Sequence, residues 1–295
     1  MKTKVHIDFH AKDIPGEAAA ILTPSGCGSD VADVSDFTIV GTRTVFVRIK
    51  LDEGDERVSK VLALLQQFGV KFDTWTYTEY SDEDLQNARL LLMTPDANVF
   101  VFAGHQYGTE YDLTNACPNC KTGAKQTSVL YVGHDDIKTI RKHRAVQTRS
   151  DEILVDGGMR KKLIDARITG ISFGDVRARH ENGKWSMVAR DQILIEHIMP
   201  PMRGEFPAEY DKYLCKVCVR GGRMSWPDKL YRKEDLMGMQ DFNLTWEWFG
   251  IFGPADDQYR ERRSNPRILV TPKVMNIFRE AGVKTFNWTP VAIEE

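Results

Sequence analysis

Four cysteines carry the clearest chemical signal in this sequence. They occur as two C-x-x-C pairs, Cys117 with Cys120 and Cys215 with Cys218. Each pair is followed, three residues after its second cysteine, by a glycine, Gly123 or Gly221. Such a pattern is typical of a knuckle, a tight turn in which two thiolates point at one metal ion and glycine supplies a positive φ. We name residues 117–123 the first knuckle and residues 215–221 the second knuckle. Together they predict a tetrahedral four-cysteine shell of the kind that holds structural Zn²⁺.

The residues around the cysteines favour a zinc site over a redox-active pair or an iron–sulfur cluster. Between Cys120 and Cys215 lie 94 residues, so the ion is expected to join two distant segments rather than to build a small finger. A thioredoxin-like redox pair lies at a helix N-terminus, whereas the residues after each pair here, Lys-Thr-Gly-Ala and Val-Arg-Gly-Gly, break helices. An iron–sulfur cluster also accepts four cysteines, but two similar knuckles favour a single ion. Because four thiolates fill the shell, we expect a structural zinc site.

The N-terminus and the apolar runs bear on location. Residues 1–10 carry charges where a signal peptide would have its apolar stretch, and no apolar run approaches the ~20 residues of a membrane-spanning helix. We therefore expect a cytoplasmic protein with reduced thiols and no membrane contact. The fifth cysteine, Cys27, lies in a glycine-rich stretch and is interpreted as a bystander rather than a reactive thiol.

Composition places the chain among ordinary globular proteins. Of its 295 residues, 42% are hydrophobic and 28% are charged, which is enough apolar surface for a sizeable core. The net charge of −2 predicts no strong overall attraction to nucleic acid or anionic lipid. Residues 138–180 are locally basic, with eleven Lys or Arg against five Asp or Glu. That excess is interpreted as the solvated side of helices, with nucleic-acid binding as the alternative.

An internal repeat indicates the architecture. Residues 153–176 and 268–291 align without a gap, and both open with Ile-Leu-Val. Each continues into a helical pattern and then places an aromatic residue, Phe173 or Trp288, near a closing valine. Each copy also lies downstream of a knuckle. The sequence therefore predicts a duplicated strand–helix–strand unit.

The remaining patterns complete an α+β prediction. We expect two duplicated strand–helix–strand units joined by the zinc knuckles, with an N-terminal α/β extension; the expected regions are 1–104, 105–200 and 201–295. Residues 1–40 show no clear pattern. The other expected elements are strands at 44–51, 70–77, 98–103 and 128–132, helices at 55–68 and 81–92, and a hairpin over 177–196.

No set of residues predicts catalysis. His134-Asp135-Asp136 follows a predicted strand and is interpreted as a solvated loop, and His105 lies in a loop on which no second motif converges. The sequence has no phosphate-binding glycine loop, no G-x-S-x-G and no H-E-x-x-H. The aromatic cluster Trp246, Trp248 and Phe249 is interpreted as core, with a recognition surface as the alternative. We assign no catalytic residue and no organic cofactor, and an enzyme is not favoured.

The paired knuckles and the segment 268–291 resemble the bacterial double-CXXCG-motif family, over roughly residues 105–295. In that family the glycine directly follows the second cysteine, whereas here it comes three residues later. Some members are described as immunity proteins of toxin systems. The resemblance implies a zinc-stabilised, non-catalytic protein that binds another protein, with nucleic-acid binding as the alternative.

Overall fold

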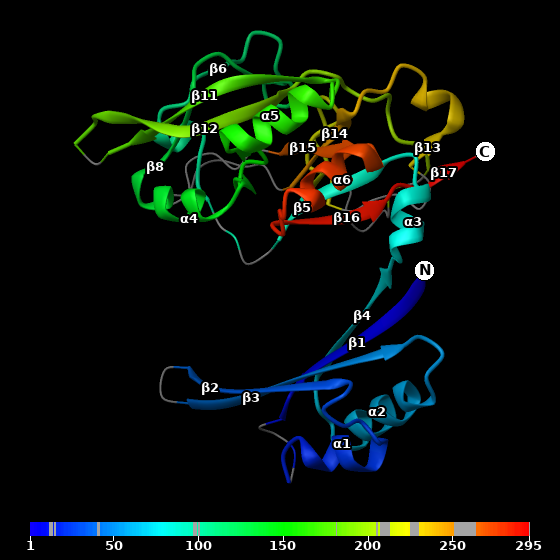
Figure 1. Ribbon diagram of the computed structural model, residues 1–295. Helices are drawn as coiled ribbons and strands as arrows, with labels where there is room; N and C mark the ends of the chain where they lie inside the picture. The colour runs from blue at the N-terminus through cyan, green and yellow to red at the C-terminus, as the bar shows by residue number, and fades with distance from the viewer. Residues whose placement is uncertain are drawn as a thin grey trace. The chain divides into compact units, whose positions relative to one another are not determined.

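Figure 1 shows the computed structural model. It describes all residues except 12, 13, 15, 40, 41, 97, 98, 100, 181, 205, 207–212, 225–229, 251–263 and 295. The chain divides into two compact units, 1–84 and 85–295, and the boundary falls within α3 (Asp82–Asn87). None of the helices in the described part of the chain is long and apolar enough to cross a membrane.

The first unit is a four-stranded antiparallel sheet with two helices. Its elements are β1 (Lys2–His10), α1 (Ala19–Ser25), β2 (Ala32–Ile39), β3 (Thr42–Asp52), α2 (Glu56–Gln67) and β4 (Phe72–Glu79). The strand order is β2-β3-β1-β4, with every neighbouring pair antiparallel. This β-α-β-β-α-β order is the split arrangement of ferredoxin-like folds. The expected strands at 44–51 and 70–77 and the helix at 55–68 are confirmed as β3, β4 and α2.

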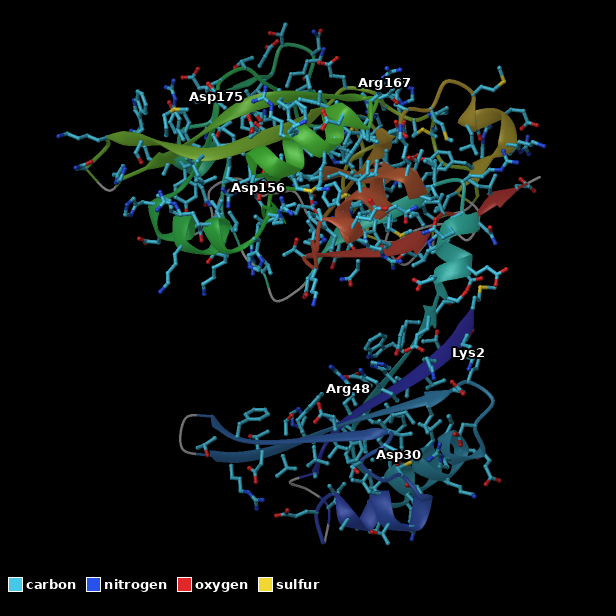
Figure 2. All side chains as sticks on the ribbon, viewed as in Figure 1. Lys2, Asp30, Arg48, Asp156, Arg167 and Asp175 are labelled. Carbon is cyan, nitrogen blue, oxygen red and sulfur yellow. The ribbon has the colours of Figure 1, made fainter. Side chains whose placement is uncertain are left out.

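Alternation along the strands places the core of this unit. Ile7 and Phe9 of β1 and Val47 of β3 are buried with Leu65 of α2 in one cluster. The opposite face carries charged and aromatic side chains: Arg48 points from β3 away from the helices (Figure 2) and forms an ion pair of 2.7 Å with Asp8, and the rings of His6 and Trp75 lie 4.0 Å apart. Residues 1–40, which the sequence left unassigned, thus supply half of the unit.

The second unit contains two larger sheets. The five-stranded sheet has the order β8-β11-β12-β10-β9, and the four-stranded sheet has the order β14-β15-β5-β16; we name them the β12 sheet and the β5 sheet. The strands of the β12 sheet are β8 (Leu130–Gly133), β9 (Ala145–Gln147), β10 (Ile153–Val155), β11 (Ile171–Arg179) and β12 (Trp185–Ile195). Those of the β5 sheet are β5 (Leu91–Pro95), β14 (Phe242–Phe249), β15 (Asn265–Val270) and β16 (Phe286–Pro290).

Helices and short ribbons complete the second unit. The helices are α4 (Ile137–Lys142), α5 (Gly157–Asp165) and α6 (Pro272–Glu280), with 3-10 turns at His105–Tyr107, His134–Asp136 and Lys233–Leu236. The two-stranded ribbons are β6 (Tyr111–Asp112) with β7 (Lys125–Gln126) and β13 (Tyr231–Arg232) with β17 (Ile293–Glu294). The Asp156 side chain starts α5 (Figure 2) by accepting a hydrogen bond of 2.7 Å from the backbone N–H of Met159. The chain as a whole is α+β, as expected.

The two segments that resemble each other in sequence have the same local topology. Each forms a strand, a helix and a second strand, and in each the two strands flank one antiparallel strand, β12 or β5. The registers correspond as well. Ile153 and Phe173 both lie opposite Ile193, whereas Ile268 and the tryptophan of β16 both lie opposite Met93.

Two expected elements differ from the structure. The helix predicted for 81–92 ends at Asn87, and Leu91–Pro95 forms β5, the strand between β15 and β16. The apolar run 90–93 reads equally well as a buried strand, and pairing on both sides decides the outcome. The strand predicted for 98–103 lies partly outside the described residues, and within 101–103 only Ala103 forms an isolated bridge, with Val132. The expected hairpin at 177–196 is confirmed as the β11–β12 pair.

Candidate metal centre

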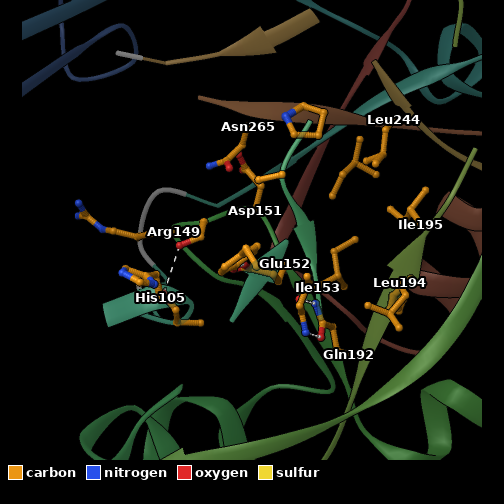
Figure 3. Close-up of a pocket in the computed structure, with 18 of the residues that line it drawn as sticks. His105, Arg149, Asp151, Glu152, Ile153, Gln192, Leu194, Ile195, Leu244 and Asn265 are labelled. Carbon is orange, nitrogen blue, oxygen red and sulfur yellow. Dashed lines mark hydrogen bonds between the residues drawn. The ribbon is translucent and has the colours of Figure 1, made fainter. Parts of the chain in front are cut away.

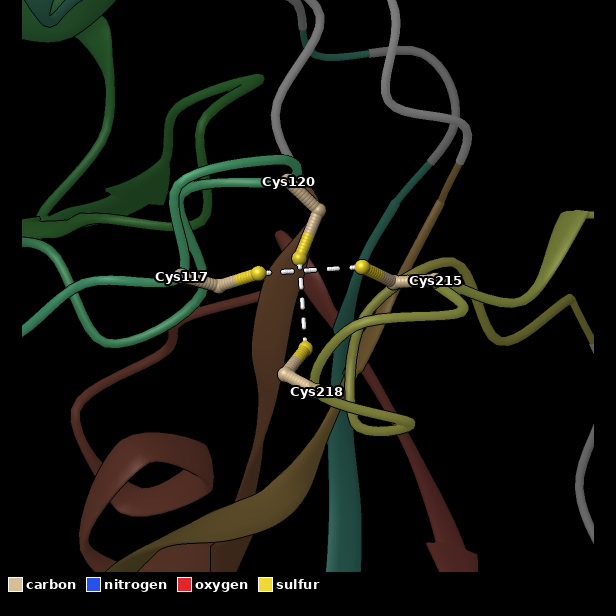
Figure 4. Close-up of side chains that lie close together, drawn as sticks. All are labelled: Cys117, Cys120, Cys215 and Cys218. Carbon is tan, nitrogen blue, oxygen red and sulfur yellow. Dashed lines mark hydrogen bonds between the residues drawn. The ribbon is translucent and has the colours of Figure 1, made fainter.

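The four cysteine side chains converge on one point (Figure 4). All four Sγ atoms lie within 4.8 Å of one another. The distance from Cys117 to Cys215 is 3.7 Å, and the distance from Cys120 to Cys218 is 3.4 Å. Zinc–thiolate bonds of ~2.3 Å place the sulfurs of a tetrahedron about 3.8 Å apart. The cluster therefore has the size of a tetrahedral thiolate site and could hold a metal ion.

The first knuckle is the loop of the β6–β7 ribbon. The backbone N–H of Cys117 donates to the carbonyl of Thr122 at 2.9 Å, and that of Lys121 donates to the carbonyl of Cys117 at 2.9 Å. Lys121 has φ 61° and Gly123 has φ 91°. This tight double turn aims both sulfurs of the pair to the same side.

The second knuckle forms a similar turn, but the hydrogen bond that closes it reaches one residue further along the chain. The N–H of Cys215 donates to the carbonyl of Gly221 at 2.9 Å, and that of Val219 donates to the carbonyl of Cys215 at 3.0 Å. The left-handed residue is Val219, with φ 53°. In both knuckles the residue directly after the second cysteine is therefore left-handed. The expectation of a positive φ is confirmed for Gly123 and is wrong for Gly221.

Gly221 is required for a different reason. A Cβ atom at this position would lie 2.7 Å from Cys120 Sγ and 2.5 Å from Thr122 Oγ1. Both distances are far inside van der Waals contact. The second knuckle thus presses its backbone against the first, and any side chain at this position would force Cys120 or Thr122 to move.

The electrostatics of the cluster favour thiolates in the second knuckle. Burial raises the pKa of Cys215, but backbone N–H groups at Cys218 and Val217 and the Asn119 amide, 3.3 Å from Cys215 Sγ, outweigh it and lower the pKa to about 6. In the first knuckle, burial dominates and raises the pKa of Cys120 to about 12. A cation among the sulfurs would favour ionisation of all four.

Each knuckle is anchored to a different sheet. Gln126, at the base of the first knuckle, exchanges two amide hydrogen bonds of 2.8 and 2.9 Å with Gln192 of β12. The chain leaving the second knuckle bonds to β14, where the Trp248 N–H donates to the Arg220 carbonyl at 2.9 Å and the Arg223 N–H donates to the Trp248 carbonyl at 3.1 Å. An ion bound by all four cysteines would therefore tie the β12 sheet to the β5 sheet.

The other sequence candidates do not join this cluster. Cys27 is buried alone in the first unit. His134 lies 3.7 Å from the exposed Asp135, whereas Asp136 accepts a hydrogen bond of 2.9 Å from the Phe102 N–H, a structural role. In the aromatic cluster, Phe249 is buried, and the guanidinium of Arg220 lies 4.6 Å over the ring of Trp246.

Comparison with known proteins adds no assignment. The chain matches no model of a known protein family, and no curated protein is significantly similar to it in sequence. The cluster itself carries the functional argument.

Gly221→Ala is expected to weaken metal binding. The added Cβ would collide with Cys120 Sγ and push the knuckles apart, so we expect affinity for Zn²⁺ to fall about 10-fold or more, as for other groups that position metal ligands. Competition with a chromophoric chelator measures this change. Gly157→Ala is the control, because a Cβ there meets open space; equal zinc affinity in both variants would contradict the argument.

Val219→Gly is expected to stabilise the protein. A left-handed backbone costs L-residues roughly 1–2 kcal/mol, partly offset by the greater freedom of glycine in the unfolded chain. We expect the free energy of unfolding to rise by about 0.5–1 kcal/mol in chemical denaturation. Val217→Gly is the matched control: Val217 is also exposed but has no positive φ, so this change should destabilise. The same sign for both variants would refute the proposed strain.

Proposed function

We propose that the four cysteines hold one structural zinc ion and that the protein acts by binding another protein. The metal assignment rests on one observation, the convergence of four buried or half-buried thiols within 4.8 Å. Zn²⁺ is the ion most commonly held by such a four-thiolate shell. Because four thiolates leave no open coordination position for a substrate or water, the ion is structural.

The charges around the cluster support a tetrathiolate zinc site. Four thiolates and one Zn²⁺ carry a net charge of −2, which requires compensation when it is half-buried. The segments 113–126 and 213–224 contain no acidic residue. They contain five basic ones: Lys121, Lys125, Lys216, Arg220 and Arg223.

The binding role is supported by the surface of the second knuckle and by the family resemblance. Val217 and Val219 are 62% and 51% exposed, and they stand beside the exposed Lys216. Two exposed aliphatic side chains close together supply apolar area for a protein contact, and the neighbouring cation would favour an acidic partner. Taken with the resemblance to double-CXXCG proteins, this favours an immunity protein that neutralises a toxin by covering it.

Nucleic-acid binding through residues 138–180 is less well supported. Several of these basic residues form ion pairs within the second unit, such as Arg160 with Asp191 at 2.7 Å and Arg144 with Asp156 at 3.3 Å. Paired cations contribute little to phosphate binding.

We further propose that residues 153–176 and 268–291 are copies of one unit. Two features support a duplication: in each copy the two strands lie on either side of one central strand, and in each an isoleucine and an aromatic residue from those two strands lie opposite the same residue of the central strand. Each copy would then have contributed one knuckle to the ion.

The purified protein is expected to contain about one zinc ion per chain, because four thiolates supply one tetrahedral shell. Cys215→Ser should lower the zinc content, reduce thermal stability and increase protease sensitivity near residues 213–224, while most secondary structure persists. Elemental analysis, thermal melting and limited proteolysis measure these effects. Cys27→Ser is the control, since this buried thiol lies outside the cluster. Iron in the wild type, or unchanged stability with complete loss of partner binding in Cys215→Ser, would contradict a structural zinc site.

The binding role is tested by co-expression with the product of the neighbouring gene. We expect the wild-type protein to restore growth if that product is toxic, and Val217→Glu to abolish the rescue by placing a charge in the contact surface. Ile164→Glu, at a comparably exposed aliphatic residue on α5, should rescue fully. Equal rescue by both variants would exclude the second knuckle as the contact surface.

A further inference from the structure

A cavity of about 680 Å³ lies in the second unit, between the β12 sheet and the β5 sheet. Its size falls within the range of small-molecule sites, ≈ 300–1,000 Å³. One side is apolar and includes Leu194, Ile195 and Leu244. The other side is polar and is formed by His105 and the turn 149–152 (Figure 3). The cavity is therefore amphipathic.

The polar wall is the tip of the β9–β10 hairpin, and it is firmly held. The Arg149 N–H donates to the Val101 carbonyl at 2.8 Å, and the Ser150 hydroxyl donates to the Ala103 carbonyl at 3.3 Å. Asp151 adopts φ 70°, a left-handed conformation that aspartate tolerates in hairpin turns. A hairpin tip usually faces solvent, but this one turns its acidic side chains into the protein.

The two adjacent carboxyl groups of this wall, those of Asp151 and Glu152, differ in whether a positively charged side chain lies beside them. Asp151 lies 3.5 Å from the Arg267 guanidinium and accepts a hydrogen bond of 2.8 Å from the Gln147 amide. The side-chain donors to Glu152 are neutral, the hydroxyls of Thr148 and Tyr111. Among the residues that the structure describes, no cationic side chain forms an ion pair with Glu152.

Arg149, a basic residue of the same turn, is not the counter-ion of Glu152. Arg149 lines the cavity, but its side chain extends away from Glu152 (Figure 3), and its guanidinium lies 5.2 Å over the ring of Phe102. Burial, together with the charge of Asp151, raises the pKa of Glu152. Glu152 is half-buried, and a carboxylate in such a place that no described cationic side chain pairs with gains from a ligand that brings a positive charge.

We propose that this cavity binds a small organic cation, an ammonium or guanidinium group on an apolar body, with the Glu152 carboxylate as its counter-ion. The charged group would lie at the 149–152 turn, and the apolar body would lie against Ile195 and Leu244. A carboxylate ligand is disfavoured because it would face two acidic side chains. The argument for this site does not rest on the metal assignment or on the protein partner proposed above.

Three probes of equal length test the proposal: n-hexylamine, hexan-1-ol and hexanoate, each titrated at pH 8 by calorimetry and thermal shift. We expect the amine to bind about 10-fold more tightly than the alcohol and hexanoate to bind most weakly. Glu152→Gln should reduce amine affinity to that of the alcohol and leave the alcohol unchanged. Asp165→Asn, an exposed acid-to-amide change on α5, should keep the preference for the amine.

Two further measurements keep the proposal open to refutation if Glu152→Gln does not fold. In the wild type, the amine should shift the methyl resonances of Ile153, Ile193 and Ile195, and Ile195→Trp should weaken binding of all three probes by narrowing the apolar side of the cavity. Equal affinity for amine and alcohol, a preference that survives Glu152→Gln, or amine binding without those methyl shifts would each overturn it.

Discussion

The second unit depends on the approach of four sulfur atoms whose segments are far apart in the chain. Cys117 and Cys215 are 98 residues apart, yet their sulfurs lie 3.7 Å from each other. Closing so long a loop costs conformational entropy, and burial raises the pKa of Cys120, so that ionising all four thiols without a cation is unfavourable. A divalent cation bound among the sulfurs would reverse this balance, because it would convert mutual repulsion into four strong bonds. The knuckle backbones and the lysines and arginines of the two segments are compatible with such an ion.

The close approach of the two knuckles accounts for Gly221, and the conformation of the second knuckle makes Val219 unusual. Gly221 lacks a side chain because the first knuckle occupies the space where a Cβ would be. Val219, by contrast, has a side chain where the backbone would favour glycine. The absence of a side chain at Gly221 lets the two pairs of sulfurs approach each other. Val219 leaves an aliphatic side chain exposed at the tip of the knuckle, and strain retained at an exposed position is a reason to look for a binding role there.

The candidate metal site could be predicted from the sequence more completely than the fold could. Four cysteines in two C-x-x-C pairs predict a shared ion because ligand chemistry depends on residue type, and the strand–helix–strand segments follow from periodicity. The position of β5 could not be derived, since the run 90–93 fits a helix or a strand until its partners β15 and β16 are known. The function of Gly221 depends on a neighbour about a hundred residues away. The turn 149–152 is polar, as surface turns are, so nothing local indicates that its carboxyl groups face a cavity.

The ribbon that carries the first knuckle and the cavity wall belong to one hydrogen-bonded structure. Tyr111 and Gln126 are paired residues at the base of the first knuckle; the Tyr111 hydroxyl lies 3.4 Å from Glu152, and Gln126 bonds to Gln192 of β12. An ion that fixed the knuckle would therefore also fix two residues that line the cavity. Because binding energies linked through one structure are reciprocal, a ligand that ordered this wall would also favour the knuckle conformation suited to a metal. A structural ion in this position would influence recognition without touching the ligand, by holding the ribbon against the β12 sheet.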